Sequence, residues 1–306
     1  MKKKLFILGI GGLTGSKLAM LAINDFEVYG SYNLRNPKFS FVESVKLDIL
    51  DTNKLKETLS NVHPDIIINA SAINNVDFCE THHDEAKKTN IDVVEQLRKI
   101  SDSLGVKLVH LSSDSVFDGT KNFPYVEEDI PNPINYYGYT KLVGEKITLQ
   151  NSNNLVVRTT VLYGWLIKTL LNLPSSSMKP DNFVQWLVNK LKSNEQVKII
   201  TDEISSPIIV DDYARSILHL VKGNHSGIFH SAPKIQITRY DFCLKIANFL
   251  GFNSKLIQAT TNKELGRKVT TGFNKCLDSI KITNQTNFQF LSLEESFDLL
   301  KRQISS

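Results

Sequence analysis

The sequence predicts an α/β protein: a doubly wound parallel sheet of the Rossmann type, with a smaller, mostly C-terminal substrate-binding portion. Short apolar stretches alternate with segments of helical periodicity in the first half of the chain. Residues 65–69 are apolar almost throughout, as in a strand that is covered on both faces. A glycine-rich turn follows the first strand. We therefore expect a dinucleotide-binding domain over residues 1–165, rejoined by about 208–235, and a mainly substrate-binding portion over 166–306.

The composition argues against several classes of protein. The 306 residues are 41% hydrophobic, enough for a large core, and 36 basic against 32 acidic residues leave a formal net charge of +4. No basic run is interleaved with aromatic residues, so we expect no nucleic-acid partner. The three scattered cysteines show neither a disulfide framework nor metal-ligand spacing. No apolar run has the length of a membrane span or signal segment, which predicts a cytoplasmic protein without a membrane partner.

The first strand, residues 4–8, leads into a turn with three evenly spaced glycines, Gly9, Gly12 and Gly15. A helix is expected over residues 16–23. Glycines in this position let the backbone approach a pyrophosphate at a helix N-terminus. Glycine-rich turns also occur for packing reasons, but the order of strand, turn and helix favours a cofactor site.

The second strand, residues 27–32, ends without the acidic residue that usually binds the ribose of NAD. Ser31 and Arg35 could instead hold the 2′-phosphate of NADP. Arg35 could equally be a solvated loop residue. The sequence therefore favours NADP as the cofactor and keeps NAD as the alternative.

The third strand is expected over residues 45–49. Its last two residues, Asp48 and Ile49, could flank the adenine of the cofactor. Asp51 is a suitable cap for a helix that runs to Leu59.

The fourth strand ends at Asn69, and small residues follow that would let a cofactor pass close by: Ala70, Ser71 and Ala72. A long helix is expected next, over residues 85–104, and Gly105 would end it. Asn90 in this helix could brace the strand tips or could be an exposed polar residue.

The fifth strand and the following helix carry the residues that suggest chemistry. Ser112 and Ser113 end a buried strand. Tyr137 and Lys141 share one face of a helix that begins near Asn135. Lowering a phenol pKa by three units takes roughly 4 kcal/mol, and a lysine about 4 Å away supplies only about 1 kcal/mol in water, so the pair is useful only in a cleft. The alternatives are a packed tyrosine and a solvated lysine.

The rest of the chain has few long strand–helix units. The sequence predicts a strand at 155–158 and then a helical region at 166–195, broken by a Pro/Ser-rich loop at 174–177. A strand at 197–200, a helix at 212–221 and a strand at 227–230 follow, and the last of these is expected to rejoin the main sheet. The chain ends with a helix that Thr238 caps and that runs to Leu250, and with a final helix at 293–302.

Several motifs together resemble a known family. They are Gly9-x-x-Gly12-x-x-Gly15, Asn69-Ala70-x-Ala72, Ser112-Ser113-Asp114-x-Val116-Phe117-Asp118-Gly119, Tyr137-Gly138-x-Thr140-Lys141-x-x-Gly144-Glu145 and Arg158-Thr159. The pattern resembles the extended short-chain dehydrogenase/reductase superfamily, and within it the dTDP-4-dehydrorhamnose reductase-like family. That family also contains the regulatory β subunit of methionine adenosyltransferase. The resemblance covers nearly the whole chain and is most specific over residues 111–146.

The resemblance implies an NAD(P)H-dependent reductase of the 4-keto group of a nucleotide-activated deoxysugar, in cell-surface polysaccharide synthesis. Tyr137 would protonate the developing alkoxide, Lys141 would lower the Tyr137 pKa and hold the nicotinamide ribose, and Ser113 would bond the keto oxygen. Asp114 and Val161 would also face the substrate. The cofactor would meet Gly12, Leu13, Thr14, Asp48, Ile49 and residues 70–72. A homodimer is compatible with this assignment.

Two departures from the family pattern limit the assignment. The run Ser113-Asp114-Ser115 lacks the glutamate of the sugar-nucleotide dehydratases, so dehydration is not expected. The run Arg158-Thr159-Thr160-Val161 lacks the tryptophan that rhamnose-pathway reductases carry there, which leaves the sugar open. The alternatives are a non-catalytic nucleotide-binding regulatory subunit and an epimerase or reductase on another sugar nucleotide. Residues around 202–207 would clamp the nucleotide.

Overall fold

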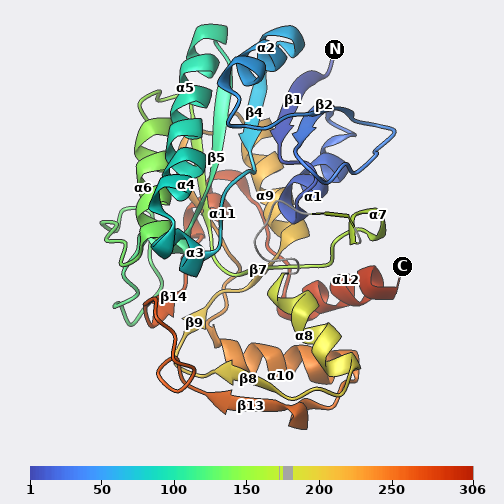
Figure 1. Cartoon of the computed structure of the whole chain (residues 1–306), viewed down its shortest axis with the longest axis vertical. Coiled ribbons are helices and arrows are strands. Elements are labelled where there is room, and N and C mark those ends of the chain that lie inside the picture. Colours follow the sequence, from blue (N-terminus) through green and yellow to red (C-terminus); the bar gives the residue numbers. More distant parts are fainter. Residues whose placement is uncertain (172, 175–181, 306) are drawn as a thin grey trace.

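The computed structural model describes residues 1–171, 173–174 and 182–305. Its centre is a seven-stranded parallel sheet in the order β11-β6-β5-β4-β1-β2-β3 (Figure 1). The strands are β1 (Lys3–Leu8), β2 (Phe26–Tyr32), β3 (Glu43–Lys46), β4 (Ile66–Asn69), β5 (Lys107–Ser113), β6 (Leu155–Thr159) and β11 (Gly227–Ser231). The late strand β11 pairs with β6 at the edge of this sheet, as expected for the strand at 227–230.

Helices cover both faces of the sheet. Successive residues of each strand point to opposite faces, and because these residues are apolar, both faces must be buried. Leu5 and Ile7 of β1 pack towards one face, and Phe6 and Leu8 towards the other. The first face is covered by α1 (Leu13–Ala22), α9 (Val210–Lys222) and α11 (Ile280–Thr286), and the second by α2 (Thr52–Val62), α5 (Val93–Leu104) and α6 (Tyr136–Thr148). This confirms the predicted doubly wound α/β architecture.

The helix expected over residues 85–104 is confirmed, because helical residues run without a gap from α4 (His83–Lys87) through a π-helical turn η1 (Lys88–Asp92) into α5, and Gly105 ends it. The sequence did not predict the π-turn or the short helix α3 (Val76–Thr81) that precedes it. Asn90 in the π-turn is buried and hydrogen-bonds both backbone groups of Ile73 and the hydroxyl of Thr140. The side chain therefore braces the segment after β4 against α6, and the helix widens where this contact is made.

The second portion of the molecule lies below the main sheet in Figure 1 and has its own hydrophobic cluster. Its helices are α8 (Phe183–Lys192), α10 (Arg239–Leu250) and α12 (Leu293–Ser305), and the short helix α7 (Lys168–Leu171) lies between β7 (Leu162–Tyr163) and α8 in the chain. Small sheets pair β7 with β10 (Ile208–Ile209), β8 (Val197–Ile200) with β13 (Ile257–Thr260), and β9 (Ile204–Ser205) with both β12 (Ile237–Thr238) and β14 (Asn274–Lys275). Two 3₁₀ turns, η2 (Asp114–Val116) and η3 (Ser254–Leu256), complete the described elements.

Three further expectations concern the bounds of the third strand, the Pro/Ser-rich break and membrane-spanning helices. The third strand lies at Glu43–Lys46, so Asp48 and Ile49 follow it in a loop. Most of the Pro/Ser-rich break expected at 174–177 lies outside the described residues. No helix in the described part of the chain is both long enough and apolar enough to cross a membrane.

Candidate active site

The carboxyl ends of the parallel strands bring distant parts of the sequence to one edge of the sheet. The register pairs Leu8 with Ser31 and with Asn69, and it pairs Ser113 with Thr159. The glycine turn after β1, the small residues after β4 and the serine at the tip of β5 therefore share this edge. Open α/β sheets bind their ligands at such an edge.

The glycine turn is held to the ends of the neighbouring strands. The amides of Gly9 and Ile10 both donate to the Ser31 carbonyl at 2.9 Å, and Gly9 has a φ of +83° that favours glycine. A Cβ on Gly9 would lie 2.7 Å from the Ser71 hydroxyl. Ser31 and Ser71 thus both contact the turn, and Ser31 does so through its carbonyl.

The other two glycines of the motif differ in what surrounds them. A Cβ on Gly15 would lie only 2.1 Å from the Gly9 carbonyl oxygen, so close packing explains this glycine. At Gly12, which is exposed, the nearest protein atom would be 3.4 Å away. The protein itself would accept a methyl group there. A glycine at this open position fits the close approach of a bound pyrophosphate beside Leu13 and Thr14, where α1 begins.

The two glycines give a matched pair of substitutions. We expect Gly12→Ala to fold with a free energy of unfolding within about 0.5 kcal/mol of wild type but to bind NADPH at least about tenfold more weakly. Gly15→Ala should instead lose roughly 1–3 kcal/mol of stability, because backbone atoms must move. Urea unfolding and NADPH fluorescence titration measure the two effects. Unchanged NADPH binding by Gly12→Ala would contradict the assignment of this turn.

The loop after β2 places Arg35 at the glycine turn. A Cβ on Gly11 would lie 2.1 Å from the Arg35 carbonyl oxygen, and the guanidinium donates to the Leu173 carbonyl through Nε at 3.3 Å and Nη2 at 3.1 Å. Asp48 is exposed and accepts from the amide of Leu50 at 3.0 Å. Ile49 packs at the edge of the α2–α5 cluster.

Helix α6 is fixed against the tip of β5. Asn135 caps it by accepting from the Gly138 amide at 2.9 Å, and Glu80 accepts from the Tyr136 amide at 2.8 Å. A Cβ on Gly138 would lie 2.0 Å from the Ser115 carbonyl oxygen, so the helix and the strand tip are in direct contact. This contact places Tyr137 close to the serine-rich tip.

The ionisation of Tyr137 differs from the sequence-based expectation. Burial raises the pKa of Tyr137, the Asp114 carboxylate raises it further, and a hydrogen-bond interaction with Ser113 opposes the shift. Lys141 was expected to lower this pKa, but the dominant cause is burial. The Ser113 hydroxyl donates to Asp114 Oδ1 at 2.8 Å. The phenol therefore keeps its proton at neutral pH and can act as an acid.

Lys141 is 3% exposed, and its ammonium makes no hydrogen bond or ion pair within the described part of the chain. Burial lowers its pKa to about 8, opposed by the charge of Glu145. The amide nitrogen of Asn69, at the end of β4, is also buried without a hydrogen-bond partner among the described residues. A buried charge without a partner is costly. These two groups therefore fit a polar ligand such as the ribose of a dinucleotide.

One turn beyond Lys141, α6 makes a buried ion pair with the sheet. Arg158 Nη2 lies 2.7 Å from Glu145 Oε2, and Arg158 Nε donates to Glu145 Oε1 at 2.8 Å. Ser112 donates to the same Oε1 at 2.6 Å. Burial lowers the pKa of His230 to about 3, so its neutral ring can accept from Arg158 Nη1 at 3.3 Å. The pair fixes α6 across β5 and β6.

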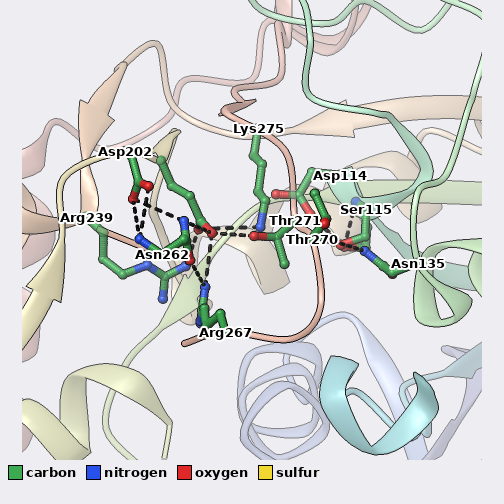
Figure 2. A network of polar contacts seen from close by, with 12 residues as sticks. Asp114, Ser115, Asn135, Asp202, Arg239, Asn262, Arg267, Thr270, Thr271 and Lys275 are labelled. Atoms are coloured by element: carbon green, nitrogen blue, oxygen red, sulfur yellow. Dashed lines mark hydrogen bonds and ion pairs between the residues drawn. The ribbon is translucent and has the colours of Figure 1, made fainter. Parts of the chain in front are cut away.

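A second polar cluster was mostly missed by the sequence analysis. It surrounds the buried carboxylate of Glu203, and Figure 2 shows its members Arg239, Arg267 and Lys275. Arg267 Nη1 lies 3.0 Å from Glu203 Oε1, while Arg239 Nη2 and Lys275 Nζ each lie 3.6 Å from Oε2. Lys275 also acts on Asp114, whose pKa is raised by burial against the lysine charge. We call these residues the Glu203 cluster.

The sequence offered little that could identify this cluster. Glu203 falls within the expected clamp at 202–207, but its cationic partners come from α10, the loop before β14 and β14 itself. No short motif or regular spacing joins them. Val161 contributes its carbonyl, which accepts from the Ile208 amide at 3.0 Å. No group of three or more His, Cys, Asp or Glu side chains in the described ranges is arranged to hold a metal ion.

Comparison with known proteins gives consistent matches. The family model described as RmlD substrate binding domain matches residues 3–303. The chain is 29% identical over 302 residues to the probable low-salt glycan biosynthesis reductase Agl14 of Haloferax volcanii, covering 98% of both chains. It is 27% identical over 298 residues to the dTDP-4-dehydrorhamnose reductase of Aggregatibacter actinomycetemcomitans, covering 94% of both.

Two further matches bear on the alternatives. Methionine adenosyltransferase 2 subunit beta of Bos taurus is 29% identical over 270 residues, which is 85% of this chain and 76% of the relative. The structure of dTDP-4-dehydrorhamnose reductase from Bacillus anthracis, in complex with NADP, superposes with a TM-score of 0.85 at 24% identity and covers 98% of this chain and 99% of that one. This structural likeness confirms the fold.

Proposed function

The chain belongs to the RmlD substrate binding domain family, and we propose that it reduces the 4-keto group of a nucleotide-activated deoxysugar with NAD(P)H. The observation that carries the proposal is that Tyr137 hydrogen-bonds Ser113 at the tip of β5 and lies one helical turn before the buried Lys141, at the sheet edge that also carries the glycine turn. Reductases of glycan and dTDP-rhamnose synthesis are similar to the chain over nearly its full length. The product would supply polysaccharide synthesis.

The cofactor would lie along the carboxyl edge of the sheet. Gly12, Leu13 and Thr14 would meet the pyrophosphate, and Asn69 and Lys141 would meet the nicotinamide side. We favour NADP over NAD, because β2 ends without an acidic residue and the backbone of Arg35, a residue that could hold a 2′-phosphate, lies beside the glycine turn. When bound, the reduced nicotinamide supplies the hydride that reduces the ketone.

The residues of this chain would handle the proton and the oxygen. Tyr137 would donate its proton as negative charge develops on the keto oxygen, because an alkoxide is a stronger base than a phenolate. Ser113 would hydrogen-bond the same oxygen and orient it. Lys141 would hold the ribose and stabilise the phenolate that forms. Each role needs water to be excluded, and the burial of Lys141 supports this.

The Glu203 cluster supports a nucleotide-activated substrate. It gathers three cations on one carboxylate: Arg239, Arg267 and Lys275. Glu203 Oε2 receives no hydrogen bond within the described residues. Arg239 and Lys275, the two cations nearest to this oxygen, therefore donate no hydrogen bond to it. A diphosphate offers these cations more acceptor oxygens than a single carboxylate does. We place the nucleotide diphosphate here, on the same side of the site as Asp114.

The low pKa of Lys141 predicts an alkaline loss of activity. Its pKa of about 8 means that the ammonium loses its proton as the pH rises through that value, whereas the raised pKa of Tyr137 keeps the phenol protonated. We expect kcat for ketone reduction to fall near pH 8. Stability should change in the opposite direction. Between about pH 8 and pH 10.5, the pKa values of Lys141 in the folded and the unfolded chain, the unfolded chain binds more protons than the folded one. The contribution of Lys141 to the free energy of unfolding therefore rises with pH in this range.

A kcat profile against pH, with urea unfolding below and above the same range, measures both effects. Lys141→Arg is the matched variant, because arginine stays charged throughout and should remove the alkaline limb even if its maximal rate is lower. A wild-type profile that is flat through pH 8 would contradict the assignment.

The proposed function is tested by titrating the protein separately with NADPH and NADH and then screening 4-keto sugar nucleotides for loss of nicotinamide absorbance. We expect stoichiometric oxidation of NADPH with at least one substrate. Turnover of a sugar nucleotide without net cofactor oxidation would indicate an epimerase. Tight nucleotide binding without turnover of any substrate, together with a stable partner enzyme, would favour the regulatory role of the methionine adenosyltransferase relative.

A further inference from the structure

The segment from Thr261 to Lys275 is the part of the chain that links the Glu203 cluster to the rest of the site. Arg267 donates to Glu203 Oε1 at 3.0 Å, and the Thr271 hydroxyl donates to the same oxygen. Lys275, at the end of the segment, approaches Oε2 to 3.6 Å. The segment therefore supplies two of the three cations on Glu203.

The same segment is tied to helix α6 by one buried side chain. Asn135 Nδ2 donates to the Thr270 carbonyl at 3.2 Å (Figure 2). Its Oδ1 caps α6 by accepting from the Gly138 amide at 2.9 Å. Thr270 directly precedes Thr271 in the sequence. One peptide unit therefore separates the contact with Glu203 from the contact with the helix that carries Tyr137.

Backbone packing holds this segment against the loop after β5. A Cβ on Gly119 would lie 2.7 Å from Gly272 Cα, and both residues have a positive φ. The amides of Phe273 and Asn274 both donate to the Gly119 carbonyl, at 3.1 and 2.9 Å. Close-packed elements of this kind shift together. The segment that contacts Glu203 is therefore in direct backbone contact with the loop after β5.

A diphosphate at the Glu203 cluster would redistribute the contacts of the segment. Arg267 and Lys275 would hydrogen-bond phosphate oxygens in addition to, or in place of, Glu203, and charge-assisted bonds of this kind are strong. The segment would be ordered by the ligand, and Thr270 would be fixed with it. Asn135 would then hold the first turn of α6 in one position.

We propose that Asn135 is a positioning residue that couples nucleoside diphosphate binding at the Glu203 cluster to the placement of Tyr137. The identity of the ligand rests on the proposed function, but the coupling rests on the contacts of Asn135, Thr270 and Thr271. A substrate that brings its diphosphate would thereby set the position of the acid that protonates its keto oxygen.

The two hydrogen bonds of Asn135 can be separated by one substitution. In Asn135→Asp, a carboxylate oxygen still caps α6, because Asp and Asn are equivalent N-caps, but the donor to Thr270 is lost. Amide hydrogen exchange with and without dTDP measures the consequence. In the wild type we expect dTDP to slow exchange in residues 261–275 and in the first turn of α6. In Asn135→Asp we expect the first effect to remain and the second to be lost.

Asn75→Asp is the matched control, because Asn75 caps α3 through its side-chain oxygen and the substitution adds the same charge at a helix N-terminus. It should leave both exchange effects of dTDP in place. Kinetics give a second readout. Asn135→Asp should lower kcat about tenfold with a 4-keto sugar nucleotide, a coupling of about 1.4 kcal/mol, and should leave turnover of a small ketone without a nucleotide unchanged.

Three results would overturn the coupling: dTDP protecting neither segment of the wild type, equal protection of α6 in the wild type and in Asn135→Asp, or loss of protection in both segments of the variant. An equal loss of kcat with both kinds of ketone would show a purely structural role. Failure of the proposed function looks different, because NADPH oxidation would be absent while the exchange pattern persisted.

Discussion

Replacing Tyr137 by phenylalanine is expected to lower kcat by about 10²- to 10⁴-fold, the range typical for loss of a general acid. The ring would still pack between α6 and the tip of β5, because only the hydroxyl is removed. NADPH affinity should therefore stay within about twofold of wild type, a difference of about 0.4 kcal/mol. Steady-state absorbance kinetics and NADPH fluorescence titration on the same preparation measure the two quantities.

Tyr139→Phe is the matched control for this variant. Tyr139 lies two residues further along α6 and is 49% exposed, so loss of its hydroxyl should change neither kcat nor cofactor binding. Undiminished reduction by Tyr137→Phe would refute the acid role of Tyr137 and leave the site as a binding site. Equal losses in both variants would point to a general disturbance of α6.

The main sheet was predictable because each buried strand is a short apolar run between turn-forming residues. Residues 65–69 are the clearest case: Ile66, Ile67 and Ile68 face both covered sides, so the run shows no alternation. The caps of α2 and α10 were also visible, since Asp51 and Thr238 each precede a helical period, and α6 begins near Asn135 as expected. Local chemistry decides these features, and the sequence displays local chemistry directly.

The π-turn between α4 and α5 was not predictable, because the contacts made there are long-range. Asn90 lies within a helical period, but its side chain hydrogen-bonds Ile73 and Thr140, which are distant in the sequence. The Glu203 cluster was missed for the same reason. Its cations come from stretches that only the folded second portion brings together, and each alone resembles an ordinary surface charge.

The sequence predicted that Tyr137 and Lys141 act together, and that remains a proposal, but it did not predict the direction of the Tyr137 pKa shift. Spacing places Lys141 one turn from Tyr137, and from this we expected the ammonium to dominate. Burial of the phenol and the carboxylate of Asp114 act more strongly. Spacing along a helix shows which groups are near one another, whereas the pKa depends on how much solvent the whole fold removes.

Removing Arg158 is expected to produce the largest loss of stability among these substitutions. Arg158→Met would leave the Glu145 carboxylate buried without its counter-ion, and breaking a buried ion pair in this way typically costs about 3–5 kcal/mol. Both side chains are 2% exposed, so water cannot replace the lost contacts. The free energy of unfolding from urea titration measures the effect, and we expect Lys141-dependent activity to fall as well, because Glu145 lies one turn beyond Lys141 on α6.

The double variant Glu145→Leu/Arg158→Met separates the cost of an unpaired charge from the value of the pair. Replacing both charges by apolar groups is often nearly neutral, so the double variant should be more stable than Arg158→Met alone. Recovery should be incomplete, because Ser112 would lose its acceptor, and adding Ser112→Ala should restore part of the remainder. A double variant as unstable as the single one would show that the ion pair stabilises the fold by itself. In that case α6 would depend on this pair for its position across the sheet.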